Sequence, residues 1–97
     1  MTLREFQKTI EAIYFERDRA RGVESNFRWL VEEIGELARA LRDDDPRALA
    51  GEFADCLAWL TSLASLKGID LETVAIEKYG RGCPRCRATP CACPPVR

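Results

Sequence analysis

The chain has 97 residues, with 15 Lys and Arg against 16 Asp and Glu, no His and a formal net charge of −1. This length suits one small domain with a limited hydrophobic core. We therefore expect a partner chain or a bound metal to contribute to its stability. The balanced charge lacks the basic excess that is typical of nucleic-acid-binding proteins, which disfavours a nucleic-acid partner. The first residues lack the apolar core of a signal peptide, and no apolar run approaches the length of a membrane span. We therefore expect a cytoplasmic protein without membrane contacts.

Two helices are predicted in the first half of the chain. The first follows Thr2, which forms a capping-box pattern with Glu5, and is expected to end near Gly22. The second is expected to follow Ser25 as its N-cap and to end in the run of aspartates that begins at Asp43. Apolar residues recur at helical spacing in both: Leu3, Phe6, Ile10, Ile13 and Tyr14, then Phe27, Leu30, Val31, Ile34, Leu37, Ala38 and Leu41.

Two further helices follow. Asp45 is a predicted N-cap, Pro46 suits the first helical position, and Gly68 is expected to stop this third helix. Asp70 is predicted to cap a short fourth helix that ends before Gly80. No segment alternates like a strand. We therefore predict an all-α protein, an antiparallel four-helix bundle whose core is completed by dimerisation, as a homodimer or homotetramer.

The composition changes abruptly at Gly80. The segment that follows holds four of the five cysteines and four of the five prolines, and almost nothing that builds a core. The chain is accordingly divided into a helical domain, residues 1–80, and a cysteine-rich tail, residues 81–97.

Carboxylates gather on the second and third predicted helices. Glu33 and Glu36 are three residues apart and share a helix face, with Glu32 on its flank, and Glu52 and Asp55 repeat this spacing after the tight turn. An ordinary solvated face is the alternative, because Glu is a strong helix former. Two pairs that border apolar positions on consecutive helices instead favour a half-buried acidic quartet that needs a cation. Oxygen ligands without His or Cys suit Mg²⁺ or Mn²⁺.

The segments "EEIGE", residues 32–36, and "EFAD", residues 52–55, resemble the EExxE…ExxD signature of the MazG-like nucleotide pyrophosphohydrolases. These belong to the all-α NTP pyrophosphatase superfamily, which also includes dimeric dUTPases. The segment "GEFADCLAWL" is similar to the usual "ELADVLIYL" of that family, and the resemblance covers about residues 2–80.

The resemblance implies a function for this acidic group. Glu33, Glu36, Glu52 and Asp55 would hold Mg²⁺ or Mn²⁺, and Glu32 would be a further ligand or the catalytic base that prepares the attacking water. The implied substrate is a nucleoside triphosphate, NTP or dNTP, which is hydrolysed to the monophosphate and pyrophosphate. The role this suggests is house-cleaning of the nucleotide pool.

Four residues are candidates for binding the rest of the nucleotide. Trp59 lies four residues after Asp55, where the family often has an aromatic residue, and Trp29 is placed similarly before Glu33. The alternative for both tryptophans is a core residue, and core packing is favoured for Trp29. Lys78 and Arg81 resemble basic residues that the family has near the phosphates, although cations at the end of a helix are favourable by themselves.

The tail carries the cysteine pattern CxxC-x4-CxC, formed by Cys83, Cys86, Cys91 and Cys93. Four thiolates at such spacing, among turn-forming prolines and glycines, predict a structural Zn²⁺ site, a small zinc knuckle. The alternatives are a disordered tail or a redox CxxC pair, neither of which fits four free thiols in a reducing compartment. The remaining cysteine, Cys56, is expected to be a small buried apolar residue.

A second kind of function stays open. The knuckle and its basic residues could instead bind nucleic acid or a protein partner, and the helices would then be only a dimerisation scaffold. The knuckle could also cap the active site or recognise substrate in the same enzyme. The basic residues in question are Arg81, Arg85, Arg87 and Arg97.

Overall fold

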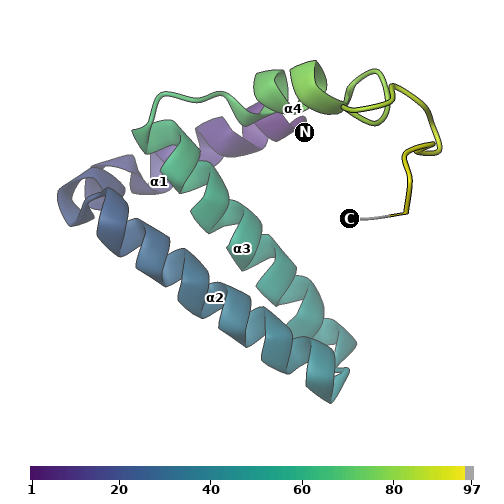
Figure 1. Cartoon of the computed structure of the whole chain (residues 1–97). Helices are drawn as coiled ribbons and strands as arrows, with labels where there is room; N and C mark the ends of the chain where they lie inside the picture. Colours follow the sequence, from purple (N-terminus) through teal and green to yellow (C-terminus); the bar gives the residue numbers. More distant parts are fainter. Residues whose placement is uncertain (96–97) are drawn as a thin grey trace.

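The protein is all-helical within residues 1–95, which are the residues that the computed structural model describes. Val96 and Arg97, the latter named above as a basic residue near the cysteines, lie outside the described residues. The described part contains no strand and four helices (Figure 1), as predicted: α1 Leu3–Arg21, α2 Val23–Asp43, α3 Pro46–Leu66 and α4 Leu71–Tyr79. None of these helices combines the length and the apolar character that crossing a membrane requires.

A single glycine separates α1 from α2. The Thr2 hydroxyl accepts a hydrogen bond from the Glu5 amide at 3.1 Å and the Glu5 carboxylate accepts one from the Thr2 amide at 2.9 Å, which confirms the predicted capping box. Gly22 ends α1 with a φ of 91°, a value that glycine adopts without strain. It also serves as the N-cap of α2, which begins at Val23. The prediction of Ser25 as N-cap is therefore wrong, because the chain reverses within one residue and Ser25 already lies inside the helix.

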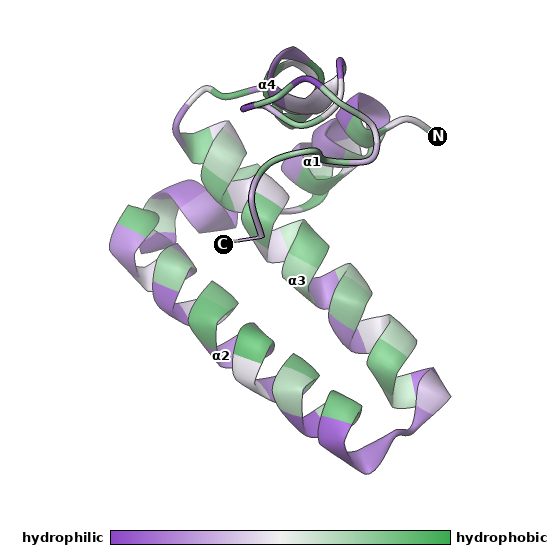
Figure 2. Cartoon of the chain, turned by 45° about the vertical axis from the view of Figure 1, so that its right-hand side comes forward, coloured by the Kyte–Doolittle hydropathy of each residue, from purple (hydrophilic) through white to green (hydrophobic). Residues whose placement is uncertain are grey.

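The α2–α3 hairpin is the longest part of the fold (Figures 1 and 2). Asp44 ends α2 in the left-handed conformation with a φ of 51°. The Asp45 carboxylate then accepts hydrogen bonds from the amides of Arg47 and Ala48 at 3.1 and 3.4 Å, with Pro46 in the first turn of α3. Since this turn is so short, the two helices run antiparallel and side by side along their length.

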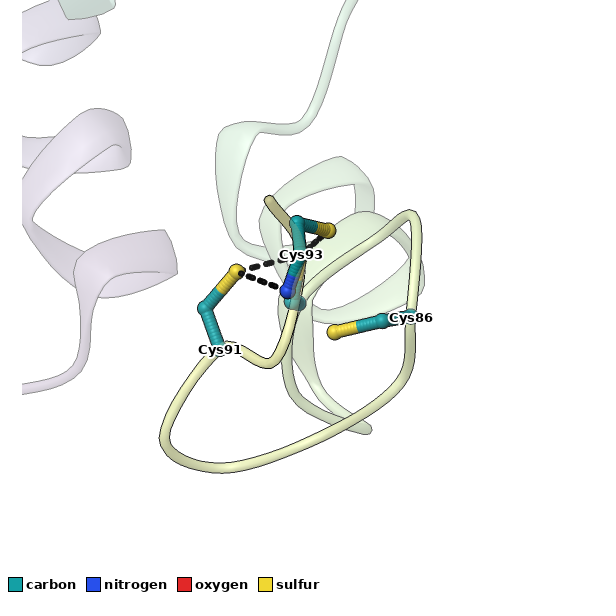
Figure 3. A group of neighbouring side chains, drawn as sticks. Cys86, Cys91 and Cys93 are labelled. Atoms are coloured by element: carbon teal, nitrogen blue, oxygen red, sulfur yellow. Dashed lines mark hydrogen bonds between the residues drawn. The ribbon is translucent and has the colours of Figure 1, made fainter. Parts of the chain in front are cut away.

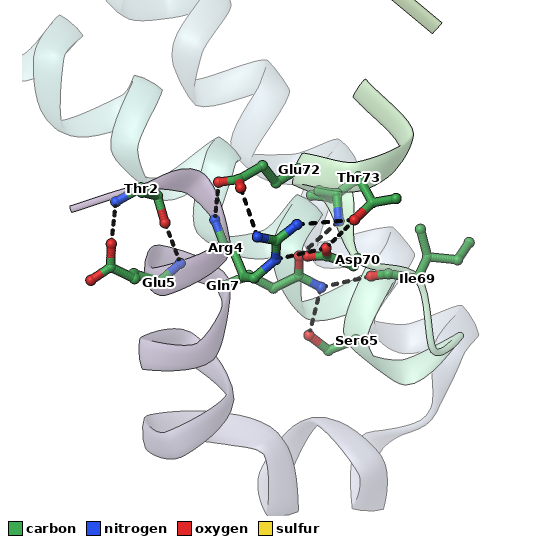
Figure 4. A network of polar contacts seen from close by, with 10 residues as sticks. Thr2, Arg4, Glu5, Gln7, Ser65, Ile69, Asp70, Glu72 and Thr73 are labelled. Atoms are coloured by element: carbon green, nitrogen blue, oxygen red, sulfur yellow. Dashed lines mark hydrogen bonds and ion pairs between the residues drawn. The ribbon is translucent and has the colours of Figure 1, made fainter. Parts of the chain in front are cut away.

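A polar network joins the start of α1 to the start of α4 (Figure 4). The Arg4 guanidinium lies 2.9 Å from the carboxylates of both Asp70 and Glu72. The buried Gln7 side chain donates to the Ile69 carbonyl at 2.8 Å. Asp70 occupies the predicted N-cap position of α4, but its side chain makes no capping hydrogen bond, and its carboxylate accepts instead from Arg4 of α1 and from the Thr73 hydroxyl of α4.

The apolar core of one chain is small. Among the described residues, the buried apolar residues are Ile10, Leu30, Ala40 and Ala64. Helix α3 packs against α2 and α1, and α4 packs mainly against α1.

Hydrophobic residues recur along both long helices, α2 and α3, while the turn that joins them is hydrophilic (Figure 2). Many of these apolar residues stay exposed: Phe27, Val31, Ile34 and Leu41 on α2, and Phe53, Leu57 and Leu60 on α3. The helical class is confirmed, and completion of the bundle by a second chain stays a prediction.

Candidate metal and substrate sites

Three of the four predicted magnesium ligands come together between α2 and α3. Glu33 and Asp55 lie equally far along the chain from Asp44, one before the turn and one after it, so an antiparallel hairpin places them at the same level. Glu52 is one turn of helix before Asp55 and faces the same side. One carboxylate oxygen from each of the three lies within 4.8 Å of the other two. We call Glu33, Glu52 and Asp55 the carboxylate group.

The environment of the carboxylate group is unfavourable for three unpartnered charges. Burial raises the pKa of Glu33, and the proximity of Glu52 and the negative charges of Asp55 and Glu36 raise it further. The Glu52 Oε2 atom is buried and has no hydrogen-bond partner. Since buried polar atoms are rarely left unpaired, this oxygen indicates a missing partner. A divalent cation with a preference for oxygen ligands fits the donor set and removes the repulsion.

The other two acidic residues of the predicted site lie outside this group. Glu36 is about half exposed, and its carboxylate pairs with the Arg39 guanidinium on the same helix at 3.3 Å. Glu32 is exposed to solvent. Glu36 would have to leave Arg39 in order to join the other three.

Cys56, which follows Asp55 in the sequence, lies beside the carboxylate group. Its side chain is half-buried, and burial together with the charges of Glu33, Glu52 and Asp55 raises the pKa of the thiol. The thiol is therefore held protonated at neutral pH, which suits a small apolar neighbour of the carboxylate group better than a metal ligand.

The two tryptophans predicted to contact the nucleotide contact each other. The rings of Trp29 on α2 and Trp59 on α3 are stacked, with centroids 5.9 Å apart and planes inclined by 9°. The Arg21 guanidinium lies over the Trp59 ring, 5.2 Å from its centroid. A base that stacked on Trp59 would have to share or displace these contacts.

Three of the predicted substrate-binding residues, Trp59, Lys78 and Arg81, line two separate cavities. One of about 190 Å³ lies between α1 and α3, and its walls include Asp55 of the carboxylate group and Trp59. The other, of about 730 Å³, is lined by residues from the end of α4 and from the tail, including Lys78, Arg81 and Arg87. No residue of α2 or α3 lines this second cavity. Within one chain, Lys78 and Arg81 are thus not brought together with the carboxylate group.

The four tail cysteines converge as their spacing predicted. Their sulfur atoms all lie within 4.8 Å of one another, with Cys83 at 3.5 Å from Cys91 and 3.7 Å from Cys93. Figure 3 shows Cys86, Cys91 and Cys93 approaching from different parts of the loop. Thiolates around a zinc ion with Zn–S bonds of about 2.3 Å are about 3.8 Å apart, so these separations fit a tetrahedral site.

The loop backbone supports this thiol cluster, which consists of Cys83, Cys86, Cys91 and Cys93. Hydrogen bonds from the amides of Cys86 and Arg85 lower the pKa of Cys83 to about 6, whereas the neighbouring sulfurs raise that of Cys93 to about 12. The Ala92 amide donates to the Cys86 sulfur at 3.2 Å. Amides directed at sulfur stabilise thiolates, the form in which cysteine binds metals.

Gly82 gives the thiol cluster its closed loop. Its φ is 104°, and a Cβ atom placed there would lie 2.8 Å from the Thr89 hydroxyl. The Cys83 amide is thereby able to donate to the Ala88 carbonyl at 3.1 Å. This backbone hydrogen bond closes the part of the loop that carries Cys86.

Sequence reasoning missed the part of α1 that faces the carboxylate group. Tyr14, Arg17 and Arg21 line the 190 Å³ cavity together with Asp55. A signal was present, because these three positions are spaced by three and four residues and therefore share one helix face. Charged residues on an exposed face are common, so the spacing alone did not distinguish them.

Comparison with known proteins agrees with the geometry of the carboxylate group. No individual curated protein is similar enough to this chain to be matched by sequence. The model of the MazG nucleotide pyrophosphohydrolase domain matches residues 21–87, which is more than half of the 97-residue chain. The matched span contains all of α2, α3 and α4 and runs on through Cys83 and Cys86. The span also includes Glu33, Glu52 and Asp55, which the fold gathers between α2 and α3. Because the match covers more than half of its length, the chain belongs to the MazG nucleotide pyrophosphohydrolase family.

Proposed function

We propose that this chain is a nucleoside triphosphate pyrophosphohydrolase that depends on Mg²⁺ or Mn²⁺. It would convert an NTP or dNTP to the monophosphate and pyrophosphate, as a house-cleaning enzyme of the nucleotide pool. The single observation that carries the proposal is the approach of Glu33, Glu52 and Asp55 within 4.8 Å, around a buried Glu52 oxygen that has no partner.

The residues that would hold the metal are Glu33, Glu52 and Asp55. Glu36 would become a fourth ligand if its carboxylate left Arg39 and bound the ion. A bound divalent ion polarises phosphoryl oxygens and offsets the charge of the departing pyrophosphate. On this proposal the α-phosphate would lie beside the carboxylate group, since a polyanion approaches three carboxylates only where their charge is neutralised.

Glu32 is the proposed base. It is exposed on the flank of α2, next in sequence to Glu33, and outside the carboxylate group. A carboxylate in that position is able to accept a proton from the water that attacks the α-phosphorus, while its neighbours are occupied as ligands. Glu32→Gln should therefore lower kcat more than it weakens metal binding.

The activity is tested by measuring pyrophosphate release from a panel of NTPs and dNTPs with Mg²⁺, Mn²⁺ or a chelator. We expect release only with the metals, and a loss of about 100-fold or more in Asp55→Asn. Glu24→Gln, at the exposed start of α2, is the matched control and should stay active. The proposal fails if no nucleotide releases pyrophosphate, or if a folded Asp55→Asn variant is as active as the wild type. Binding of RNA or DNA with a steep salt dependence, and no hydrolysis, would favour the non-enzymatic alternative.

A structural zinc ion is the second part of the proposal. Cys83, Cys86, Cys91 and Cys93 offer four sulfurs at suitable separations, and backbone amides stabilise thiolates among them. The tail lacks apolar residues that would close a core, so metal binding would supply its folding energy. On this proposal the tail is a small zinc-binding unit attached to the helical domain.

We also propose that the active form is a homodimer or homotetramer. Phe27, Val31 and Ile34 on α2 are each at least half exposed in one chain, at 50–55% of their surface, and Phe53 on α3 is exposed to 54%. Apolar side chains gathered along adjoining helices are expected to be covered by another subunit. Sedimentation equilibrium tests this proposal: a dimer or tetramer is expected for the wild type, with weakened association in Ile34→Glu. A monomer at micromolar concentration would contradict it.

A further inference from the structure

The cavity between α1 and α3 is built from two helical stripes that face each other. Helix α1 contributes Tyr14, Arg17, Asp18 and Arg21, and α3 contributes Asp55, Ala58, Trp59 and Ser62. Both sets have the spacing of a single helix face. The small side chains of Ala58 and Ser62 leave the space that a larger residue would fill. This volume, about 190 Å³, is smaller than the roughly 300–1,000 Å³ of sites for complete drug-sized ligands, so it suits one part of a substrate.

The end of this cavity that is formed by α1 offers positive charge to an anion, because Arg17 and Arg21 line it. Asp55 belongs to the carboxylate group and marks the metal end. Arg21 is already engaged, because its guanidinium donates to Asp18 at 3.2 Å and to Asn26 at 3.1 Å. Arg17 lies one turn of helix before Arg21, is exposed, and has no ion pair within residues 1–95. Arg17 is therefore the uncommitted cation of the cavity.

We propose that Arg17 binds the β- and γ-phosphates of the triphosphate and holds the departing pyrophosphate. This inference rests on the proposed function, since it takes the α-phosphate to be positioned at Asp55 and the carboxylate group. A triphosphate that begins at Asp55 and continues between α1 and α3 leads its terminal phosphates to the α1 wall. Guanidinium groups bind phosphate oxygens through paired, charge-assisted hydrogen bonds.

Arg21 has a supporting role in this arrangement. Its contacts with Asp18, Asn26 and the Trp59 ring fix one wall of the cavity. Because Asp18 compensates its charge, Arg21 adds less attraction for a polyanion than Arg17 does. The two arginines are thus distinguished by their partners, although they lie on the same face of α1.

The test measures binding rather than turnover. Isothermal titration calorimetry with Mg²⁺ compares a non-hydrolysable α,β-methylene dNTP with the matching dNMP, which lacks the β- and γ-phosphates. In Arg17→Gln we expect the analogue to bind about tenfold more weakly, the scale of a lost hydrogen bond to a charged group, and the dNMP to bind as in the wild type. Arg17→Lys should restore part of the affinity. Arg47→Gln, an exposed arginine in the first turn of α3, is the matched control and should change neither affinity.

The outcomes separate this inference from the proposed function. If the wild type releases pyrophosphate but Arg17→Gln binds the analogue as tightly as the wild type does, the role of Arg17 is overturned and the function stands. An equal loss of affinity for the analogue and the dNMP also overturns it, because Arg17 would then contact the nucleoside or the α-phosphate. If Arg17→Gln selectively weakens analogue binding while no nucleotide is hydrolysed, the assignment of Arg17 to the β- and γ-phosphates holds and the proposed activity fails.

Discussion

Trp29 and Trp59 stack across the α2–α3 hairpin, with ring centroids 5.9 Å apart and planes inclined by 9°. Each tryptophan lies four residues from an acidic residue of the carboxylate group, Trp29 before Glu33 and Trp59 after Asp55. The aromatic pair thus joins the two helices one turn away from the place where their carboxylates repel each other. Attraction between the rings helps to hold the hairpin closed where charge opposes closure.

The first prediction concerns the coupling energy of this aromatic pair. Replacing Trp29 and Trp59 by Leu, singly and together, should give a coupling energy of about 1 kcal/mol in a double-mutant cycle. The free energy of unfolding is measured by urea denaturation of the metal-free chain. Strictly additive effects would show that the stacked rings do not interact in solution.

The second prediction concerns Glu52, whose Oε2 atom is buried without a partner. In the metal-free chain, Glu52→Gln should raise the free energy of unfolding by a few tenths to about 1 kcal/mol, because one of three neighbouring negative charges is removed. The same substitution should abolish the rise in melting temperature that Mg²⁺ causes in the wild type. Thermal unfolding with and without Mg²⁺ measures both effects.

Glu24→Gln provides the comparison, since it also removes one negative charge but lies in the first turn of α2, outside the carboxylate group. It should keep the Mg²⁺-dependent rise in melting temperature. A Glu52→Gln variant that is less stable without metal and still stabilised by Mg²⁺ would contradict the proposed role of Glu52.

Much of the fold was predictable because local signals and tertiary structure agree. The capping box at Thr2 and the Asp45–Pro46 start of α3 depend on contacts within a few residues, and both occur as predicted. The start of α2 was predicted wrongly because Ser25 is a good N-cap by itself. The deciding contacts come from α1, where Asn26 bonds to the carbonyl of Asp18. The periodicity of apolar residues in the sequence does not predict a hydrogen bond between side chain and backbone across a turn.

The acidic site was predictable for a similar reason. Glu33 and Asp55 lie at the same level of an antiparallel hairpin because they are equally far from its turn, and Glu52 shares the face of Asp55, so these three carboxylates come together. The sequence did not indicate that Glu36 would pair with Arg39 instead. The contribution of α1 to the cavity was not predicted, because it depends on the angle at which α1 packs on α3, and that angle depends on the whole fold.

The third prediction concerns Asn26, which is completely buried. Its amide donates to the carbonyls of Asp18 and Gly22 at 2.8 and 2.7 Å, and its oxygen accepts from Arg21 at 3.1 Å. Asn26→Ala leaves these buried groups unpaired and should lower the free energy of unfolding by about 2–3 kcal/mol. Urea denaturation measures this change, with Ser25→Ala, the adjacent and half-buried position, as the control for helix propensity. Equal stability of the two variants would show that the turn does not depend on Asn26.

The fourth prediction concerns the thiol cluster. One Zn²⁺ or Co²⁺ per chain should bind, and Cys86→Ser should weaken binding strongly because one of four thiolates is lost. Removing the metal with a chelator should leave the helical circular dichroism nearly unchanged, since α1, α2 and α3 pack without the tail. Trypsin cleavage after Arg85 and Arg87 should become faster, and this is followed by mass spectrometry. Cys56→Ser, outside the cluster, should retain full metal stoichiometry. Absence of stoichiometric metal in the reduced wild type would contradict the zinc proposal.

The fifth prediction concerns the acid dependence of stability. Hydrogen bonds from the Thr73 hydroxyl and from Arg4 lower the pKa of Asp70 in the folded chain. A carboxyl with a lowered pKa contributes stability above its unfolded value, about 3.9, and that contribution is lost as the pH falls through the folded value. The difference in free energy of unfolding between the wild type and Asp70→Asn should therefore be constant near neutral pH and shrink below about pH 4. Urea denaturation between about pH 7 and 2.5 measures this difference.

Thr73→Val should weaken this pH dependence, because the Thr73 hydroxyl is the largest cause of the lowered pKa of Asp70. A difference that stays constant down to the lowest pH would show that the α1–α4 network does not favour the ionised form of Asp70.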